Sequence, residues 1–288
     1  MTRQRTIKDE VSIEGIGLQT GKKVTLRLHG SPPNSGINFI RLDLPNRPLI
    51  NIQSVTPDNP DPRMALERRT VLGVGPLQIQ TTEHLLSAFS GMAIDNIAAE
   101  LDSEELPGLD GSAKPFVNLL KSAKIIEQDA PRKFLMIERP VWIEKQDSFI
   151  AIFPDDFFRV SYTLSYDRPG LGTQFFSIAL NEDSYEKQIA PARTFCLEEE
   201  ALELLKRGLG KGANYDNTLV MGKDGPVKTS LRFPDEPARH KILDLVGDLY
   251  LLGLPIKGHV VAIKSGHSLN IELVRKLKIA YSACLPSD

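Results

Sequence analysis

The chain has 288 residues, 35 basic and 37 acidic side chains, a formal net charge of −2, five histidines and two cysteines. This balance gives no reason to expect a nucleic acid partner, and two cysteines exclude a disulfide scaffold or a cysteine-only zinc site. No apolar stretch approaches the ~18–20 residues of a membrane helix, and no apolar signal region follows the N-terminus. We therefore expect a cytoplasmic protein without an integral membrane segment, whose metal ligands, if any, are histidines and carboxylates.

In the first half, alternating apolar and polar residues predict strands before the pattern changes to a helical period. The predicted strands cover 11–18, 24–28, 36–44 and 97–101, and the predicted helices cover 82–92 and 114–126. The polar segment 127–133 contains Pro131 and is the best candidate for a linker between two halves.

The second half repeats the same order. Its predicted strands cover 134–144, 149–153, 159–165, 175–180 and 257–264, and its predicted helices cover 198–207, 237–252 and 269–279. Strands followed by helices in each half favour an α+β fold over a doubly wound parallel sheet. We expect two similar domains, residues 1–128 and 132–288, each with a mainly antiparallel sheet packed on paired helices. The repeated order also suggests an internal duplication.

One polar stripe lies on an otherwise apolar predicted helix. His240 and Asp244 are four residues apart and share a helix face, and Asp248 continues the stripe by one turn. Such a pair can hold a metal ion, or it can be an ion pair on a solvated face. Spacing alone favours the ion pair and leaves the metal site open.

Two further histidines lie where a site could form. Glu83 and His84 are adjacent at a predicted helix start, which fits either an acidic first turn or a metal ligand beside a catalytic base. His267 follows Ser265 and Gly266 at the junction of a strand and a helix, where side chains reach the end of a sheet.

The remaining candidates favour structural interpretations. For His29 and His259 we expect surface or structural positions. The glycine-rich segment 208–212 lacks the spacing of a phosphate-binding loop, which favours a flexible loop. The acidic run 100–110 has no calcium-loop spacing, which favours a solvated strand edge and turn.

Taken together, several segments in this order resemble the UDP-3-O-acyl-N-acetylglucosamine deacetylase family, zinc-dependent enzymes of lipid A biosynthesis. The segments are EGIGLQTG (14–21), TTEHLLSAFSGMAIDN (81–96), ELPGLDGSAKPFV (105–117), PARTF (191–195), YDNTLV (215–220), RHKILDLVGDLYLLG (239–253) and KSGHSLN (264–270). The resemblance implies two α+β domains packed face to face, with their helices meeting at the interface and the site between them.

The resemblance also implies a role for each site residue. The implied metal ligands are His84, His240 and Asp244, around one catalytic Zn²⁺ that Fe²⁺ could replace in cells. The implied catalytic residues are Glu83 as general base, His267 as general acid or electrostatic stabiliser, Thr194 at the oxyanion and Asp248 as the carboxylate that orients His267. Lys241 and Phe195 are the implied substrate-binding residues.

The implied reaction is hydrolysis of the N-acetyl group of a UDP-activated, 3-O-acylated glucosamine by a monomer, with release of acetate. For the acyl chain we expect an apolar channel along 196–214. Gln19 departs from the family pattern, which has a histidine there, so contacts at that edge of the site can differ. Two alternatives stay open: a diverged metal amidohydrolase acting on another acylated amide or sugar nucleotide, and a non-catalytic binding module.

Overall fold

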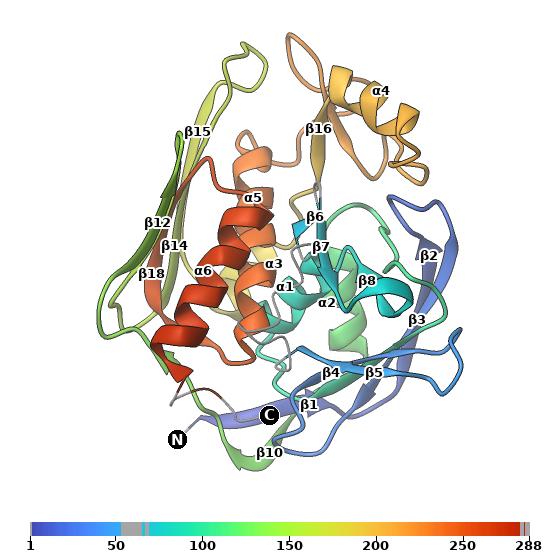
Figure 1. Ribbon diagram of the computed structural model, residues 1–288, viewed down its shortest axis with the longest axis vertical. Helices are drawn as coiled ribbons and strands as arrows, with labels where there is room; N and C mark the ends of the chain where they lie inside the picture. The colour runs from blue at the N-terminus through green and yellow to red at the C-terminus, as the bar shows by residue number, and fades with distance from the viewer. Residues whose placement is uncertain (1, 53–64, 67–68, 283–284, 286–288) are drawn as a thin grey trace.

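The computed structural model describes residues 2–52, 65–66, 69–282 and 285. Two β-sheets form the outer layers, and the helices α1, α2, α5 and α6 lie between them (Figure 1). This arrangement confirms the expected α+β class. Within the described residues, no helix combines the length and the apolar character that crossing a membrane requires.

The first sheet is built from the N-terminal half in the order β2-β3-β9-β4-β5. Its strands are Val11–Ile16 (β2), Lys23–Gly30 (β3), Ile37–Arg41 (β4), Leu49–Asn51 (β5) and Ile97–Leu101 (β9). β9 runs antiparallel to β3 and parallel to β4, while the outer pairs are antiparallel. In β3, Val24, Leu26 and Leu28 are buried and alternate with more exposed residues, which is the period of two that predicted this strand.

The second sheet has the order β12-β13-β18-β14-β15, with β11 paired to β18 outside this path. Its strands are Leu135–Met136 (β11), Val141–Lys145 (β12), Ser148–Phe153 (β13), Phe158–Ser165 (β14), Thr173–Ala179 (β15) and Ile256–Ile263 (β18). β18 is antiparallel to β13 and parallel to β14, and the outer pairs are again antiparallel. The two sheets therefore share one topology, which supports the suggested duplication.

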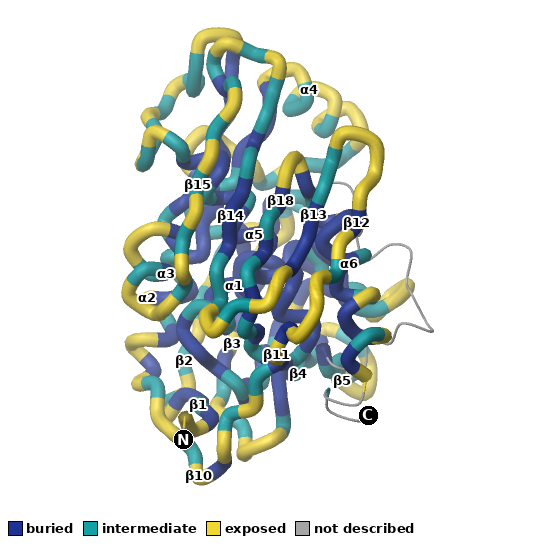
Figure 2. Tube along the Cα trace, turned by 90° about the vertical axis from the view of Figure 1, so that its left-hand side faces the viewer, coloured by how far each residue is buried: buried dark blue, intermediate teal, exposed yellow. Residues whose placement is uncertain are grey.

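The helices occupy equivalent places in the two halves. α1 (Glu83–Gly91) and α5 (Glu236–Leu249) each precede the central strand of their sheet, and α2 (Lys114–Ser122) and α6 (His267–Ala280) follow it. α1 packs directly against α5 in the middle of the molecule. Figure 2 shows that burial is concentrated in this central layer, whereas β15 and α4 contain only exposed and intermediate residues. The equivalent helices α1 and α5 of the two halves therefore face each other.

Several boundaries differ from the sequence-based expectation. The helix expected over 114–126 ends at Ser122, and residues 125–131 form β10 (Ile125–Pro131), which pairs antiparallel with β1 (Arg3–Ile7). Most of the expected linker is therefore a strand, because its backbone pairs with the N-terminus, a partner that is distant in sequence. The division of the chain near residue 130 stays a prediction.

Other differences are local. The strand expected over 134–144 is split into β11 and β12, and α5 ends in the 3₁₀ turn Tyr250–Leu252. Besides β1, β5 and β10, the short elements that the sequence did not indicate are β6 (Ala65–Leu66), β7 (Arg69–Leu72), the 3₁₀ turn Gly75–Leu77, β8 (Ile79–Gln80), α3 (Glu182–Gln188), β16 (Phe195–Leu197) and β17 (Leu219–Met221). β16 and β17 pair in parallel, and α4 (Glu198–Lys206) lies between them in the sequence. This unit lies at one end of the molecule (Figure 1).

The close approach of α1 and α5 depends on Gly247. A Cβ atom at this position would lie 2.0 Å from the backbone oxygen of Glu83. We expect Gly247→Ala to lower the free energy of unfolding by roughly 1–3 kcal/mol, because the clash is with backbone that cannot rotate away. Thermal unfolding measures this effect. Gly266→Ser is the control, because among the described residues nothing beyond its chain neighbours lies within 4 Å of an added Cβ there; an equally stable Gly247→Ala protein would contradict the close packing.

Candidate active site

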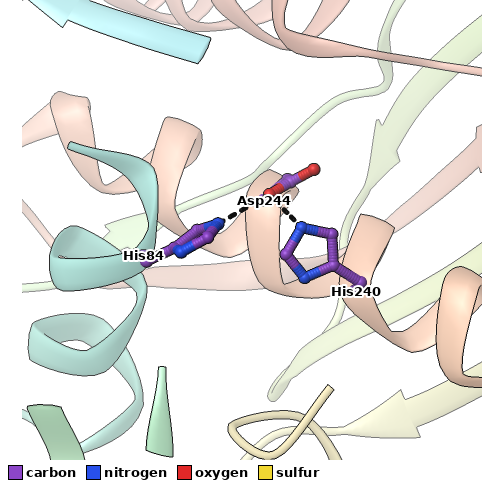
Figure 3. A group of neighbouring side chains, drawn as sticks. All are labelled: His84, His240 and Asp244. Carbon is purple, nitrogen blue, oxygen red and sulfur yellow. Dashed lines mark ion pairs between the residues drawn. The ribbon is translucent and has the colours of Figure 1, made fainter. Parts of the chain in front are cut away.

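Three side chains from α1 and α5 converge in the buried centre of the molecule. The Nε2 atom of His240 lies 3.2 Å from Oδ1 of Asp244, and Nε2 of His84 lies 3.8 Å from the same oxygen (Figure 3). One ligand atom from each residue lies within 4.8 Å of the other two. All three residues are buried. The three side chains named as metal ligands in the sequence analysis are therefore brought together, and His240 and Asp244 do share a helix face.

The chemistry of this group fits a divalent metal ion. Burial, together with the nearby His240, lowers the pKa of His84 to about 3, so its imidazole is neutral and keeps a lone pair for a metal. His240 directs Nδ1 toward the backbone oxygen of Ala192 at 3.1 Å, which orients Nε2 toward the group. Two imidazoles and one carboxylate are ligands typical of a catalytic metal site with a position left for water or substrate.

Lys241 supports the same carboxylate. Its Nζ atom donates to Oδ2 of Asp244 at 2.8 Å, so the second carboxylate oxygen is held while Oδ1 faces the histidines. Burial would raise the pKa of Asp244, but the neighbouring His240 and Lys241 hold it well below its ordinary value. Asp244 is therefore an ionised ligand. Lys241 also lies 5.6 Å from the ring centre of Phe195.

A second carboxylate lies beside the group. Glu83 is 2% exposed, and burial raises its pKa to about 7. Its Oε1 atom lies 3.9 Å from Nε2 of His267. A carboxyl group whose pKa is close to neutral exists in both protonation states near pH 7, which suits a group that takes up and returns a proton.

His267 is the first residue of α6, at the strand-to-helix junction where the sequence placed it. Its Nδ1 atom lies 2.8 Å from Oδ2 of Asp248, and its Nε2 atom lies 3.9 Å from Oδ2 of Asp244. Burial by itself would lower the pKa of His267, but the charges of Asp248 and Asp244 raise it to about 9. The imidazole therefore carries a proton at neutral pH and can donate it.

A cavity extends from the histidines toward α4. Thr194 and Phe195 line it together with Glu83, His84 and Lys241. Farther out, part of its lining comes from the segment in which an apolar channel was expected, namely Cys196, Ala201, Leu204, Leu205, Gly210, Ala213 and Asn214. All nine residues named from the sequence are therefore at the metal group, at the wall of this cavity or, for Asp248, in contact with His267.

Gln19 joins the two halves at the edge of the cavity. Its side-chain Oε1 accepts from the backbone nitrogen of Gly210 at 3.2 Å, and its backbone oxygen accepts from Lys211 at 3.2 Å. The glycine-rich segment 208–212, expected to be a flexible loop, is thus attached to the first half. Gln19, where the sequence led us to expect altered contacts at this edge of the site, therefore makes a structural contact between the halves.

Sequence reasoning missed the part played by Glu105. The acidic run was expected to be solvated, but Glu105 is 0% exposed and accepts from the backbone nitrogens of Gln19 and Thr20 at 2.8 Å. It also accepts from the hydroxyl of Thr81, two residues before Glu83, at 2.8 Å. The expectation is therefore wrong for Glu105, which ties the cavity edge to the start of α1. Its position between Glu104 and Leu106 gave no local signal of burial.

A buried group of two histidines and an aspartate that could hold a metal ion, next to a glutamate with a raised pKa and a protonated histidine, is the arrangement of a metal-dependent hydrolase. Comparison with known proteins agrees with this class. Residues 4–279 match the family model for UDP-3-O-acyl N-acetylglycosamine deacetylase, and the chain belongs to this family.

Curated relatives with the name UDP-3-O-acyl-N-acetylglucosamine deacetylase cover nearly the whole chain. The protein from Anaeromyxobacter sp. (strain Fw109-5) is 41% identical over 95% of this chain and 88% of its own length. The protein from Chlamydia abortus is 42% identical over 95% of this chain and 96% of its own length. The protein from Coxiella burnetii is 41% identical over 98% of this chain and 92% of its own length.

Proposed function

We propose that this protein hydrolyses the N-acetyl group of UDP-3-O-(3-hydroxyacyl)-N-acetylglucosamine and releases acetate, as a step of lipid A biosynthesis. The observation that carries the proposal is Glu83, a buried carboxylate with a pKa near 7 beside three side chains suited to a metal. Family membership supplies the substrate class, because the relatives carry the name of this deacetylase.

The proposed steps assign one task to each group. Glu83 takes a proton from water as the water oxygen attacks the acetyl carbonyl carbon. The hydroxyl of Thr194, at the cavity wall, donates a hydrogen bond to the developing oxyanion. His267 gives its Nε2 proton to the nitrogen as the C–N bond breaks, because an unprotonated nitrogen would have to leave as an amide anion, which is a very poor leaving group. The products are acetate and the free amine.

We propose Zn²⁺ as the metal held by His84, His240 and Asp244. When bound there, the ion supplies Lewis acidity that polarises the carbonyl and makes water easier to deprotonate. Fe²⁺ fits the same ligands, and the order of metal affinities allows zinc to displace it during purification. Elemental analysis and activity of protein purified anaerobically, compared with protein reloaded with each ion, would identify the native metal.

For the substrate, we propose that Lys241 and Phe195 contact the sugar nucleotide at the inner end of the cavity, and that the acyl chain follows the apolar lining toward α4. Burial by itself would lower the pKa of Lys241, but its partner Asp244 raises this pKa above the ordinary value, so Lys241 carries a positive charge.

We further propose that the protein acts as a monomer, since one chain supplies the complete site. Light scattering coupled to size-exclusion chromatography tests the oligomeric state.

The proposal is tested by an assay that measures acetate release from the UDP-linked acylated sugar, with the non-acylated UDP-N-acetylglucosamine as the control. We expect rapid release from the acylated substrate and much slower release from the control. Equal rates, or hydrolysis of a different acylated amide only, would favour the diverged amidohydrolase. Absence of hydrolysis with metal fully bound would favour the non-catalytic binding module.

A change in pH dependence should follow from Asp248→Asn. Activity requires protonated His267, so the alkaline limb of the pH–rate profile should follow its pKa of about 9. Asparagine removes the charge that contributes most to raising this pKa, so the alkaline limb should move to lower pH, toward the ordinary value of 6.5. Asp248 contributes less to the raised pKa of Glu83, so the acidic limb should move less. An unmoved alkaline limb would show that His267 does not carry the proton.

A further inference from the structure

Thr70 lies between the catalytic groups of the two halves, although nothing in its local sequence singles it out. It belongs to β7 and is 0% exposed. The described residues that line the cavity do not include it. Any effect of Thr70 on the reaction must therefore act through other side chains.

Its backbone is fixed to the start of α1. The backbone nitrogen of Thr70 donates to Oε2 of Glu83 at 3.0 Å, and its backbone oxygen accepts from the backbone nitrogen of Thr82 at 3.3 Å. The first contact occupies one oxygen of the proposed base and leaves Oε1 on the side of His267, 3.9 Å from Nε2. Thr70 thus sets which Glu83 oxygen faces His267.

Its hydroxyl contacts the other half of the molecule. Oγ1 of Thr70 lies 2.6 Å from Oδ1 of Asp248, which is 0% exposed. The second oxygen of Asp248 accepts from Nδ1 of His267 and from Nδ2 of Asn270, both at 2.8 Å. A carboxylate can only accept, so the Thr70 hydroxyl donates to Asp248.

These contacts fix the rotation of Asp248 and direct the Nδ1–H group of His267 toward it. Oγ1 of Thr70 also lies 3.1 Å from Nδ1 of His267. The hydroxyl proton of Thr70 is directed to Asp248, so a lone pair of Oγ1 faces the Nδ1–H group of His267. This N–H group donates mainly to Asp248, which lies closer. His267 therefore keeps its Nδ1 proton, and Nε2 is left to face Glu83 and the cavity.

We infer that Thr70 is a positioning residue that holds Glu83 and the Asp248–His267 pair in one geometry across the interface between the halves. Its main chain holds the base and its hydroxyl holds the carboxylate that orients the acid. This inference rests on the proposed function for the roles of Glu83 and His267, and the contacts that carry it are separate from the metal ligands. Substrate binding does not involve Thr70, so its loss should reduce kcat and leave KM unchanged.

Thr70→Val keeps the shape of the side chain and removes the hydroxyl, while Thr70→Ser keeps the hydroxyl. For the zinc-loaded protein, we expect Thr70→Val to lower kcat by about 10–100-fold, because misplacing a catalytic group by about 1 Å can cost roughly 10²-fold in rate. KM and the zinc content should stay as in the wild type, and Thr70→Ser should restore most of kcat. Thr6→Val is the matched control, because Thr6 is also buried and donates at 2.6 Å to the backbone oxygen of Asn96, outside the site; its kcat should be unchanged.

A kcat for Thr70→Val equal to that of the wild type would overturn the inference. So would a kcat for Thr70→Ser as low as that for Thr70→Val, because the hydroxyl would then not be the cause. If Thr70→Val does not fold, Thr70→Ala compared with Thr70→Ser gives the same test of the hydroxyl.

Nitrogen NMR of histidine-labelled protein separates this inference from the proposed function, because it needs no substrate. At a fixed pH, Thr70→Val should shift the Nδ1 signal of His267, and Thr6→Val should not. An inactive wild-type protein with a shifted Nδ1 signal in Thr70→Val would refute the proposed reaction alone. An active wild-type protein with an unshifted signal in Thr70→Val would refute the positioning role alone.

Discussion

Replacing His84 by alanine is expected to remove the bound metal and the hydrolytic activity together. His84 is the one member of the metal group that α1 contributes, and the two ligands left on α5 do not complete a catalytic site. Loss of the ion's charge stabilisation, several kcal/mol, corresponds to a fall in kcat/KM of roughly 10³-fold or more. Metal content after dialysis and the rate of acetate release measure the two effects on the same protein.

His259 provides the matched control for this substitution. It lies in β18, and its Nε2 atom contacts Oγ of Ser161 at 2.8 Å, away from the metal group. His259→Ala should keep one metal ion per chain and the wild-type rate. A His84→Ala protein that retains its metal and its activity would exclude His84 as a ligand and, with it, the proposed centre between α1 and α5.

Glu83→Gln should differ from His84→Ala in metal content: we expect it to keep the metal and still to have very little activity. The glutamine keeps the size of the side chain and an oxygen that can accept from the backbone nitrogen of Thr70. It cannot take a proton from water, and the loss of a general base typically costs roughly 10²–10⁴-fold in rate. The measurement is kcat for acetate release with metal content determined in parallel.

Glu186→Gln is the control for a carboxylate of the same type. Glu186 pairs with Lys114 and Lys121 outside the cavity, and its amide variant should react at the wild-type rate. A Glu83→Gln protein with nearly normal kcat would show that another group takes the proton. A Glu83→Gln protein without metal would instead make Glu83 a ligand, and the base would have to be sought elsewhere.

The candidate site was largely predictable because its signals are local or form ordered motifs. The spacing of His240 and Asp244 placed both on one helix face, and the structure places them 3.2 Å apart. That spacing did not separate a metal site from a surface ion pair. The order of motifs along the chain favoured the metal site, and the burial of both residues excludes the surface ion pair.

Other parts of the site could not be predicted, because their function depends on residues distant in sequence. Glu105 looked like one of several solvated acidic residues, and only the approach of residues 19–20 and Thr81 makes it a buried acceptor. The positioning role inferred for Thr70 depends on contacts with Glu83, 13 residues away, and Asp248, 178 residues away. The segment 125–131 became a strand because β1 supplied its hydrogen bonds.

The sequence by itself therefore determined the α+β class, most helices and strands, the ligand types and the family resemblance. Each of these follows from hydrophobic periodicity, residue spacing or short motifs, whose residues lie close together in the sequence. The tertiary structure decided that α1 and α5 meet closely at Gly247, that one cavity joins the two halves, and that Thr70 links base and acid. These features follow from the packing of segments that are distant in sequence. Packing buries their side chains, and burial changes pKa values. A buried polar group can then bond only to the partners that the fold places beside it.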